Sequence, residues 1–150
     1  MRDGNIRVST EAHHRELYNN MKTCGAIEDF HEFFFACVCV GYSRGKARPL
    51  ERKDDRFWSR TVTPLEWDCY HAIIMQVNDF QVSAVMDEKR MFEKLEEYAN
   101  AGIDIIIDEF LRDYLITRDA RDSPQLDPNG VINLPKAFLY YLLQQSEARS

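Results

Sequence analysis

The sequence predicts an all-α protein, a compact single-domain bundle of five or six helices with one basic extended loop. Three observations predict this class. Apolar residues recur at the three- and four-residue spacing of a helix face, and capping residues and glycines bracket the segments in which they do so. The chain also has 150 residues, of which 45% are apolar, enough for the core of one domain. We therefore expect residues 1–150 to form one helical domain, with 1–8 and 148–150 loosely attached.

The first two helices are expected in "STEAHHRELYNNMKTCG" and in "IEDFHEFFFACVCVG". Ser9 or Thr10 would cap the first helix, and Gly25 would end it. The second segment begins with acidic residues, which suit the positive end of a helix dipole, and Gly41 is its expected end. Apolar residues cover nearly every face of this segment, so it is predicted to be the central helix. A β-strand also fits "FFFACVCV", because a short apolar run suits both structures.

The clearest helix boundary lies at "TPLEW". Thr63 is the expected N-cap, Pro64 the first helical residue, and Glu66 the second member of a capping box. A helical stripe then follows through Leu65, Cys69, Ala72, Ile73 and Gln76. The segment "FQVSAV", which comes next, fits an extended conformation.

A long helix is expected after Asp87, its N-cap, in "EKRMFEKLEEYANAGIDIIIDEFLRDYLI". Gly102 permits either a kink or a break into two helices. "TRDARDSPQLDPNG" is predicted to be a loop, and Pro135 opens the last helix, "LPKAFLYYLLQQSEARS". The apolar positions of the long helix are Met91, Leu95, Tyr98, Ile103, Ile106, Phe110, Leu111, Tyr114 and Leu115.

The sequence predicts no membrane contact, no metal and no cofactor. No apolar run approaches the roughly 18 residues that cross a bilayer, and the first residues lack the apolar centre of a signal peptide, so a cytoplasmic location is expected. The cysteines are expected to be buried, reduced packing residues, and the histidines show no metal-ligand spacing, although a site assembled between helices stays open. These residues are Cys24, Cys37, Cys39, Cys69, His13, His14, His31 and His71.

A basic segment is the most informative local feature. Between residues 43 and 60, seven basic residues stand against three acidic ones, a net charge of +4 in a chain of −6. The seven are Arg44, Lys46, Arg48, Arg52, Lys53, Arg56 and Arg60. They predict either a surface for DNA or an acidic partner protein, or a solvated loop. The end of the segment, "RFWSRTV", looks extended, and Phe57 and Trp58 could stack on a ligand or anchor the loop.

Carboxylates provide the rival, enzymatic hypothesis. Asp104 and Asp108 share a helix face, and with Glu109 they could hold Mg²⁺ or act as acid and base in a metal-dependent nuclease. The alternative is a solvated polar face. The sequence contains no complete phosphate-binding loop and no nucleophile elbow, so an enzyme is not favoured.

Two segments resemble a known family. Residues 28–50, "EDFHEFFFACVCVGYSRGKARPL", and residues 91–106, "MFEKLEEYANAGIDII", resemble two segments of dnd system-associated proteins. These are small accessory proteins encoded beside bacterial DNA phosphorothioation (dnd) gene clusters. Ala101 stands where that pattern has glycine, and the cysteine-rich "ACVCVG" also departs from it. The resemblance implies association with a defence system that marks or restricts DNA by backbone sulfur, and it implies no catalytic residues.

The expected function is therefore that of a non-catalytic accessory or adaptor protein of a DNA phosphorothioation-linked antiphage system. Its partners would be other subunits of a DNA modification or restriction system, reached through the seven basic residues. DNA binding would be weak, because the acidic chain repels DNA. The alternatives are the metal-dependent nuclease and a structural homo-oligomer; the sequence does not predict an oligomeric state.

Overall fold

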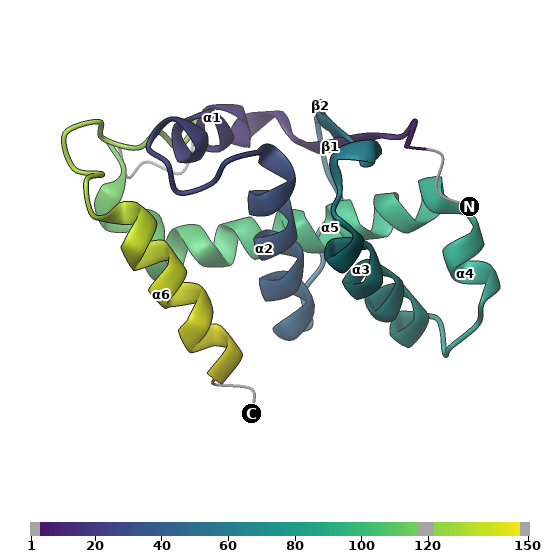
Figure 1. Cartoon of the computed structure of the whole chain (residues 1–150). Coiled ribbons are helices and arrows are strands. Elements are labelled where there is room, and N and C mark those ends of the chain that lie inside the picture. The colour runs from purple at the N-terminus through teal and green to yellow at the C-terminus, as the bar shows by residue number, and fades with distance from the viewer. Residues whose placement is uncertain (1–3, 117–121, 148–150) are drawn as a thin grey trace.

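A crossing of two helices organises the fold (Figure 1). The computed structural model describes residues 4–116 and 122–147, and it is mostly helical, as predicted, with a small two-stranded sheet that the all-α prediction missed. Helix α2 (Phe30–Ser43) crosses α5 (Glu88–Ile106), and this is the most extensive contact between any two elements described.

Glycines bring the two helices into backbone contact. A Cβ atom on Gly41 would lie 2.1 Å from the carbonyl oxygen of Tyr98, and one on Gly102 would lie 1.8 Å from that of Cys37. Gly41 therefore does not end α2, which continues to Ser43, and α5 continues through Gly102 without a break. The predicted helix end at Gly41 and the alternative of a break at Gly102 were wrong for one reason: these glycines serve close approach between helices, which local sequence does not reveal.

Helix α2 is the central helix, as predicted, and the alternative of a strand was wrong. Phe33, Phe34 and Val38 are fully buried. The Phe34 ring meets the ring of Phe57 edge-on at 5.2 Å between centroids, and that of Tyr70 at 6.3 Å. An aromatic core therefore joins α2 to the elements around it.

The sheet replaces the expected start of the first helix. Strand β1 (Arg7–Glu11) pairs antiparallel with β2 (Lys53–Trp58), so Ser9 and Thr10 are strand residues and not helix caps. A 3₁₀ turn then leads into α1 (Arg15–Thr23). The partner strand lies more than forty residues away, so the pairing has no local signal, whereas the extended character of "RFWSRTV" is confirmed through Trp58.

The expected loose ends are only partly covered by the structure. Arg7 and Val8, within the expected loose start, belong to β1, and Val8 is fully buried. Residues 148–150 lie outside the described part of the chain, as do 117–121 in the predicted loop.

Helix α3 (Pro64–Val77) begins as predicted. The Thr63 side chain accepts the backbone N–H of Glu66, whose carboxylate accepts the backbone N–H of Thr63 at 2.9 Å. The buried face, however, is displaced from the predicted stripe, and Leu65 is 71% exposed. The large rings of Trp67 and Tyr70 occupy the core instead. The buried residues are Glu66, Trp67, Tyr70, Ile73 and Ile74.

The segment that fitted an extended conformation forms the short helix α4 (Ser83–Met86). The turn before it places two non-glycine residues in the left-handed region, Asp79 at φ +54° and Phe80 at φ +62°. Asp87 then caps α5 as predicted, since its side chain accepts the backbone N–H of Arg90.

Helix α5 ends in a π-helical turn, Ile107–Leu111, and a 3₁₀ turn, Arg112–Tyr114. Helix α6 (Leu134–Glu147) packs on this end, where Phe110 stacks on Tyr141 with 5.2 Å between ring centroids. None of the helices in the described ranges is long and apolar enough to cross a bilayer.

Candidate functional site

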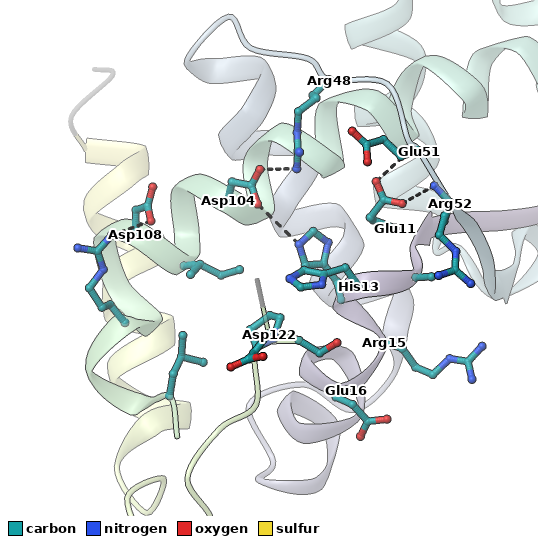
Figure 2. Close-up of a pocket in the computed structure, with 17 residues that line it drawn as sticks. Glu11, His13, Arg15, Glu16, Arg48, Glu51, Arg52, Asp104, Asp108 and Asp122 are labelled. Atoms are coloured by element: carbon teal, nitrogen blue, oxygen red, sulfur yellow. Dashed lines mark hydrogen bonds and ion pairs between the residues drawn. The ribbon is translucent and has the colours of Figure 1, made fainter. Parts of the chain in front are cut away.

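An open cleft of about 1000 Å³ lies where the basic loop meets α5 (Figure 2). Its walls come from the turn before α1, the loop that follows α2, the end of α5 and the segment after residue 121. Both signs of charge line it, with arginines and histidines facing carboxylates. Its ionisable residues include His13, His14, Arg48, Arg52, Glu11 and Asp104.

Asp104 joins two basic groups in the wall of the cleft. The Arg48 guanidinium donates to the Asp104 carboxylate, and Nε2 of His14 lies 3.6 Å from the other Asp104 oxygen. Figure 2 shows the Asp104 carboxylate joined to Arg48. His14 is only 3% exposed, whereas Asp104 is about half exposed. Asp104 thus has Arg48 as its ion-pair partner and the buried imidazole of His14 beside it.

The loop after α2 is fastened to α5. The backbone N–H of Arg48 donates to the carbonyl oxygen of Glu97 at 2.9 Å, and Nδ2 of Asn100 donates to the carbonyl oxygens of Arg48 and Pro49 at 3.1 and 3.2 Å. Asn100 is only 3% exposed, so these bonds are shielded from water. The loop around Arg48 and Pro49 is thus held against α5, and we call it the strap.

The residues that carry the family resemblance meet in this strap and at the helix crossing. Gly41 and Gly102 make the crossing, while Arg48 and Asn100 hold the strap to α5. A folding role therefore accounts for these positions of the pattern, and the pattern does not by itself argue for a contact surface.

Arg44 is the first of the predicted contact residues, and it binds within the protein. Its guanidinium makes a bidentate pair with Glu109, with both N···O distances 2.7 Å, and reaches Gln145 of α6. Hydrogen bonds from Arg44 hold the pKa of Glu109 below its ordinary value. Tyr141 also donates to Glu109, at 2.8 Å, so the carboxylate links the loop to α6.

Lys53 and Arg56 are strand residues whose charges are also balanced. Lys53 lies 3.6 Å from the buried carboxylate of Glu96, which also accepts the backbone N–H of Ser9. Arg56 is 8% exposed and donates to Asp54 at 2.7 Å. Burial lowers the pKa of Arg56 from its ordinary value. Arg56 is therefore a structural residue of the sheet.

Three of the predicted residues face water. The Arg60 guanidinium lies over the ring of Trp58, 4.8 Å from its centroid. The side chains of Lys46 and Arg52 are exposed and make no ion pair with residues 4–116 or 122–147. Three carboxylates of the α5 region balance Arg44, Arg48 and Lys53, so the segment presents far less free charge than its +4 suggests.

The three carboxylates of the rival hypothesis are paired with arginines. Asp104 binds Arg48, Glu109 binds Arg44, and Asp108 binds Arg112 at 3.0 Å. Within the described ranges, the ligand atoms of Asp104, Asp108 and Glu109 do not gather into one metal-binding group. An ion at any of them would compete with a guanidinium already in place.

One group that could hold a metal was missed by the sequence reasoning. Asp29, His31 and Glu32 bring one ligand atom each within 4.8 Å of one another at the start of α2. The local signal in the sequence is D-x-H-E at residues 29–32, which lacks the paired histidines of the familiar helical metal motifs. All four cysteines are free, as expected, but the expected burial holds for Cys37 alone, since the other three are partly exposed.

Comparison of the chain with protein-family models, with curated proteins and with solved structures finds no match.

Proposed function

We propose that this chain is a non-catalytic adaptor that joins two partner proteins through apolar surfaces at opposite ends of its helical body. The observation that carries the proposal is the exposure of large apolar side chains in two separate places. One place is α6 and the other is the turn between α3 and α4, and these lie at opposite ends of the molecule (Figure 1).

The first surface is the outer face of α6. Leu139, Tyr140 and Leu143 are 58%, 64% and 54% exposed, and their spacing places them on one side of the helix. Phe138 and Tyr141 attach the opposite side to the core. A helix with apolar residues on both faces is usual where a second protein covers the outer face.

The second surface is the tip formed by the α3–α4 turn. Phe80, Val82 and Met86 are 68%, 63% and 72% exposed. Phe80 also has a left-handed backbone, a conformation that costs a bulky residue about 1–3 kcal/mol. A strained turn that presents an aromatic side chain to water suits a docking contact, where Phe, Val and Met side chains fill an apolar pocket of a partner.

Two unlike surfaces favour an adaptor over a homo-oligomer. A symmetric dimer would use one surface and leave the other exposed. A head-to-tail contact between copies would use both, but such contacts extend into fibres unless their rotation closes a ring. Two different partners cover both surfaces and avoid that outcome.

The resemblance of residues 28–50 and 91–106 suggests where the partners belong, namely a DNA phosphorothioation-linked defence system. Lys46 and Arg52 would add an electrostatic contribution to the contact, chiefly to its association rate. Direct DNA binding through the basic loop would be weak, because most of its cations are already paired.

The test is co-expression with the proteins encoded beside this chain's own gene, followed by purification through a tag on this chain. Wild type should carry two different proteins. Leu139→Glu/Leu143→Glu should release one of them, and Phe80→Glu/Met86→Glu the other. Both variants change exposed residues only, so they should melt as wild type does.

Three results would overturn the proposal. A concentration-dependent oligomer that Leu139→Glu/Leu143→Glu abolishes, seen by light scattering, would replace the adaptor with a homo-oligomer. Cleavage of plasmid DNA in Mn²⁺ that Asp108→Ala abolishes would replace it with the nuclease. Unchanged co-purification in both surface variants would show that neither apolar surface is a contact.

A further inference from the structure

We propose that the start of α2 holds a divalent metal ion of the zinc class, bound by Asp29, His31 and Glu32. The three side chains offer one imidazole nitrogen and two carboxylate oxygens, all within 4.8 Å of one another. Imidazole nitrogen and carboxylate oxygen are both ligand atoms of Zn²⁺, and zinc sites with three protein ligands keep the fourth position for water.

The imidazole is buried and already oriented. His31 is 8% exposed, and its Nδ1 lies 2.9 and 3.1 Å from the two carboxylate oxygens of Glu66. Glu66 is itself 6% exposed and accepts the backbone N–H of Thr63. The carboxylate is thus an acceptor, and Nδ1 of His31 is the nitrogen that donates to it.

This arrangement leaves Nε2 as the ring nitrogen of His31 that makes no hydrogen bond to a described residue, and therefore as the nitrogen open to a metal ion. A metal-binding histidine commonly donates its other ring N–H to a carboxylate, which fixes the ring and makes the binding nitrogen more basic. Glu66 stands in that outer position, and it comes from α3, far from the cluster in sequence. A buried imidazole held by a buried carboxylate distinguishes the cluster from ordinary exposed acidic groups.

The two carboxylates can close around an ion. Ligand atoms around a tetrahedral Zn²⁺ lie about 3.3–3.5 Å apart, so a closing movement of about 1 Å is needed. Asp29 is the N-cap residue of α2, but its side chain makes no capping hydrogen bond, and it is 63% exposed, so it is free to turn. Glu32 accepts the backbone N–H of Glu28 at 3.3 Å, a long and therefore weak hydrogen bond that its carboxylate can give up for a metal ion.

Lys22 already pairs with one of the three proposed ligands. Nζ of Lys22 lies 3.7 Å from a carboxylate oxygen of Asp29. Metal binding would displace this ammonium group into water, at little cost because the pair is exposed. Removal of the Lys22 charge should therefore tighten metal binding, whereas loss of a ligand should weaken it.

The experiment is a calorimetric titration of the full chain with ZnSO₄, after treatment with a chelator. Wild type should bind one Zn²⁺ per chain. Asp29→Asn and Glu32→Gln should each weaken binding at least tenfold, and Lys22→Gln should strengthen it severalfold. Glu66→Gln should weaken it by about 10- to 100-fold through the ring of His31, while a glutamine can still complete the capping box.

Matched variants keep the test decisive. His13→Gln changes a partly buried histidine of the open cleft beside α5, away from the proposed metal site, and should leave the titration unchanged. Asp29→Asn alters an exposed side chain, so the fold should be kept, which circular dichroism would show. Absence of one-to-one binding, equal affinity in Asp29→Asn, or loss of binding in His13→Gln would each overturn the proposal.

Discussion

Replacement of Gly102 by alanine should destabilise the protein more than any other single-methyl change on α5. The added Cβ would lie 1.8 Å from the carbonyl oxygen of Cys37 and 2.9 Å from the backbone nitrogen of Gly41. Both neighbours are backbone atoms of the central helix, so no side chain can turn away to make room.

The size of the effect follows from that distance. An ordinary contact begins near 3.4 Å, so the two helices must separate locally by about 1.6 Å. Overpacking of this kind costs about 1–3 kcal/mol, and a gap of 0.5–1 Å forfeits about a quarter to a half of the dispersion energy of each opened contact. Alanine returns about 1 kcal/mol through its higher helix propensity. We expect a net loss of about 2 kcal/mol, the upper end of the overpacking cost less the gain in propensity.

Thermal unfolding followed by circular dichroism would measure this loss. For a chain of this length, about 2 kcal/mol lowers Tm by about 4–8 °C. Gly130→Ala is the matched control, since its Cβ would meet nothing closer than 3.8 Å. Gly41→Ala should resemble Gly102→Ala, and the double variant should cost less than the sum, because one separation relieves both clashes.

A Gly102→Ala protein that melts at or above the wild-type temperature would refute the reasoning. Such a result would mean that α2 and α5 do not approach at backbone distance, and that propensity alone governs this position. A Gly130→Ala effect of similar size would also contradict the role of the crossing, since it would show a general sensitivity to methyl groups.

Three further predictions concern the cap, the ion pairs and the free cations. Thr63→Ala should lower the free energy of unfolding by about 1 kcal/mol. Thr63→Ser should lower it much less, because the serine hydroxyl still accepts the backbone N–H of Glu66. Equal losses for the two variants in urea titrations would contradict the capping role. Hydrogen bonds from Arg44 lower the pKa of Glu109, so this pair stabilises the fold above the unfolded pKa of about 4.3 and ceases to do so as pH falls through the folded pKa. Arg44→Gln should therefore be less stable than wild type at pH 6, and the difference should shrink as the pH falls below the unfolded pKa of about 4.3. A difference that is constant with pH would count against the pair. If Lys46 and Arg52 alone contact DNA phosphates, the logarithm of the DNA-binding constant should fall with log[salt] at a slope of about −1.8. Lys46→Glu/Arg52→Glu should abolish DNA binding, whereas Lys136→Glu should not. A slope near about −3.6 would mean that the internal ion pairs open when DNA binds.

The sequence by itself determined the helical class and the positions at which chemistry is local. The capping box at Thr63 and the cap at Asp87 depend on residues three apart, and both were predicted to the residue. The burial of α2 followed from apolar residues on all its faces. Each of these features depends on residues that are close together in the sequence.

Only the tertiary structure decided what the two glycines and the basic segment do. A glycine that ends a helix and a glycine that admits another helix look the same in sequence, and Gly41 was taken for the first kind. Strand β1 likewise could not be predicted from its own residues. It forms by pairing with β2, which is distant in sequence, and a two-stranded sheet is stable only when it packs against other elements.

The candidate site shows the same limit most clearly. The basic residues were all found from composition, but Arg44 and Arg48 meet Glu109 and Asp104 across more than fifty residues of chain. Two basic residues of one predicted site are thereby paired with two carboxylates of its rival, whereas Asp108 of the rival site binds Arg112. Charge counted along a sequence ignores such pairing, because opposite charges attract through space, and the fold alone determines which of them come within reach.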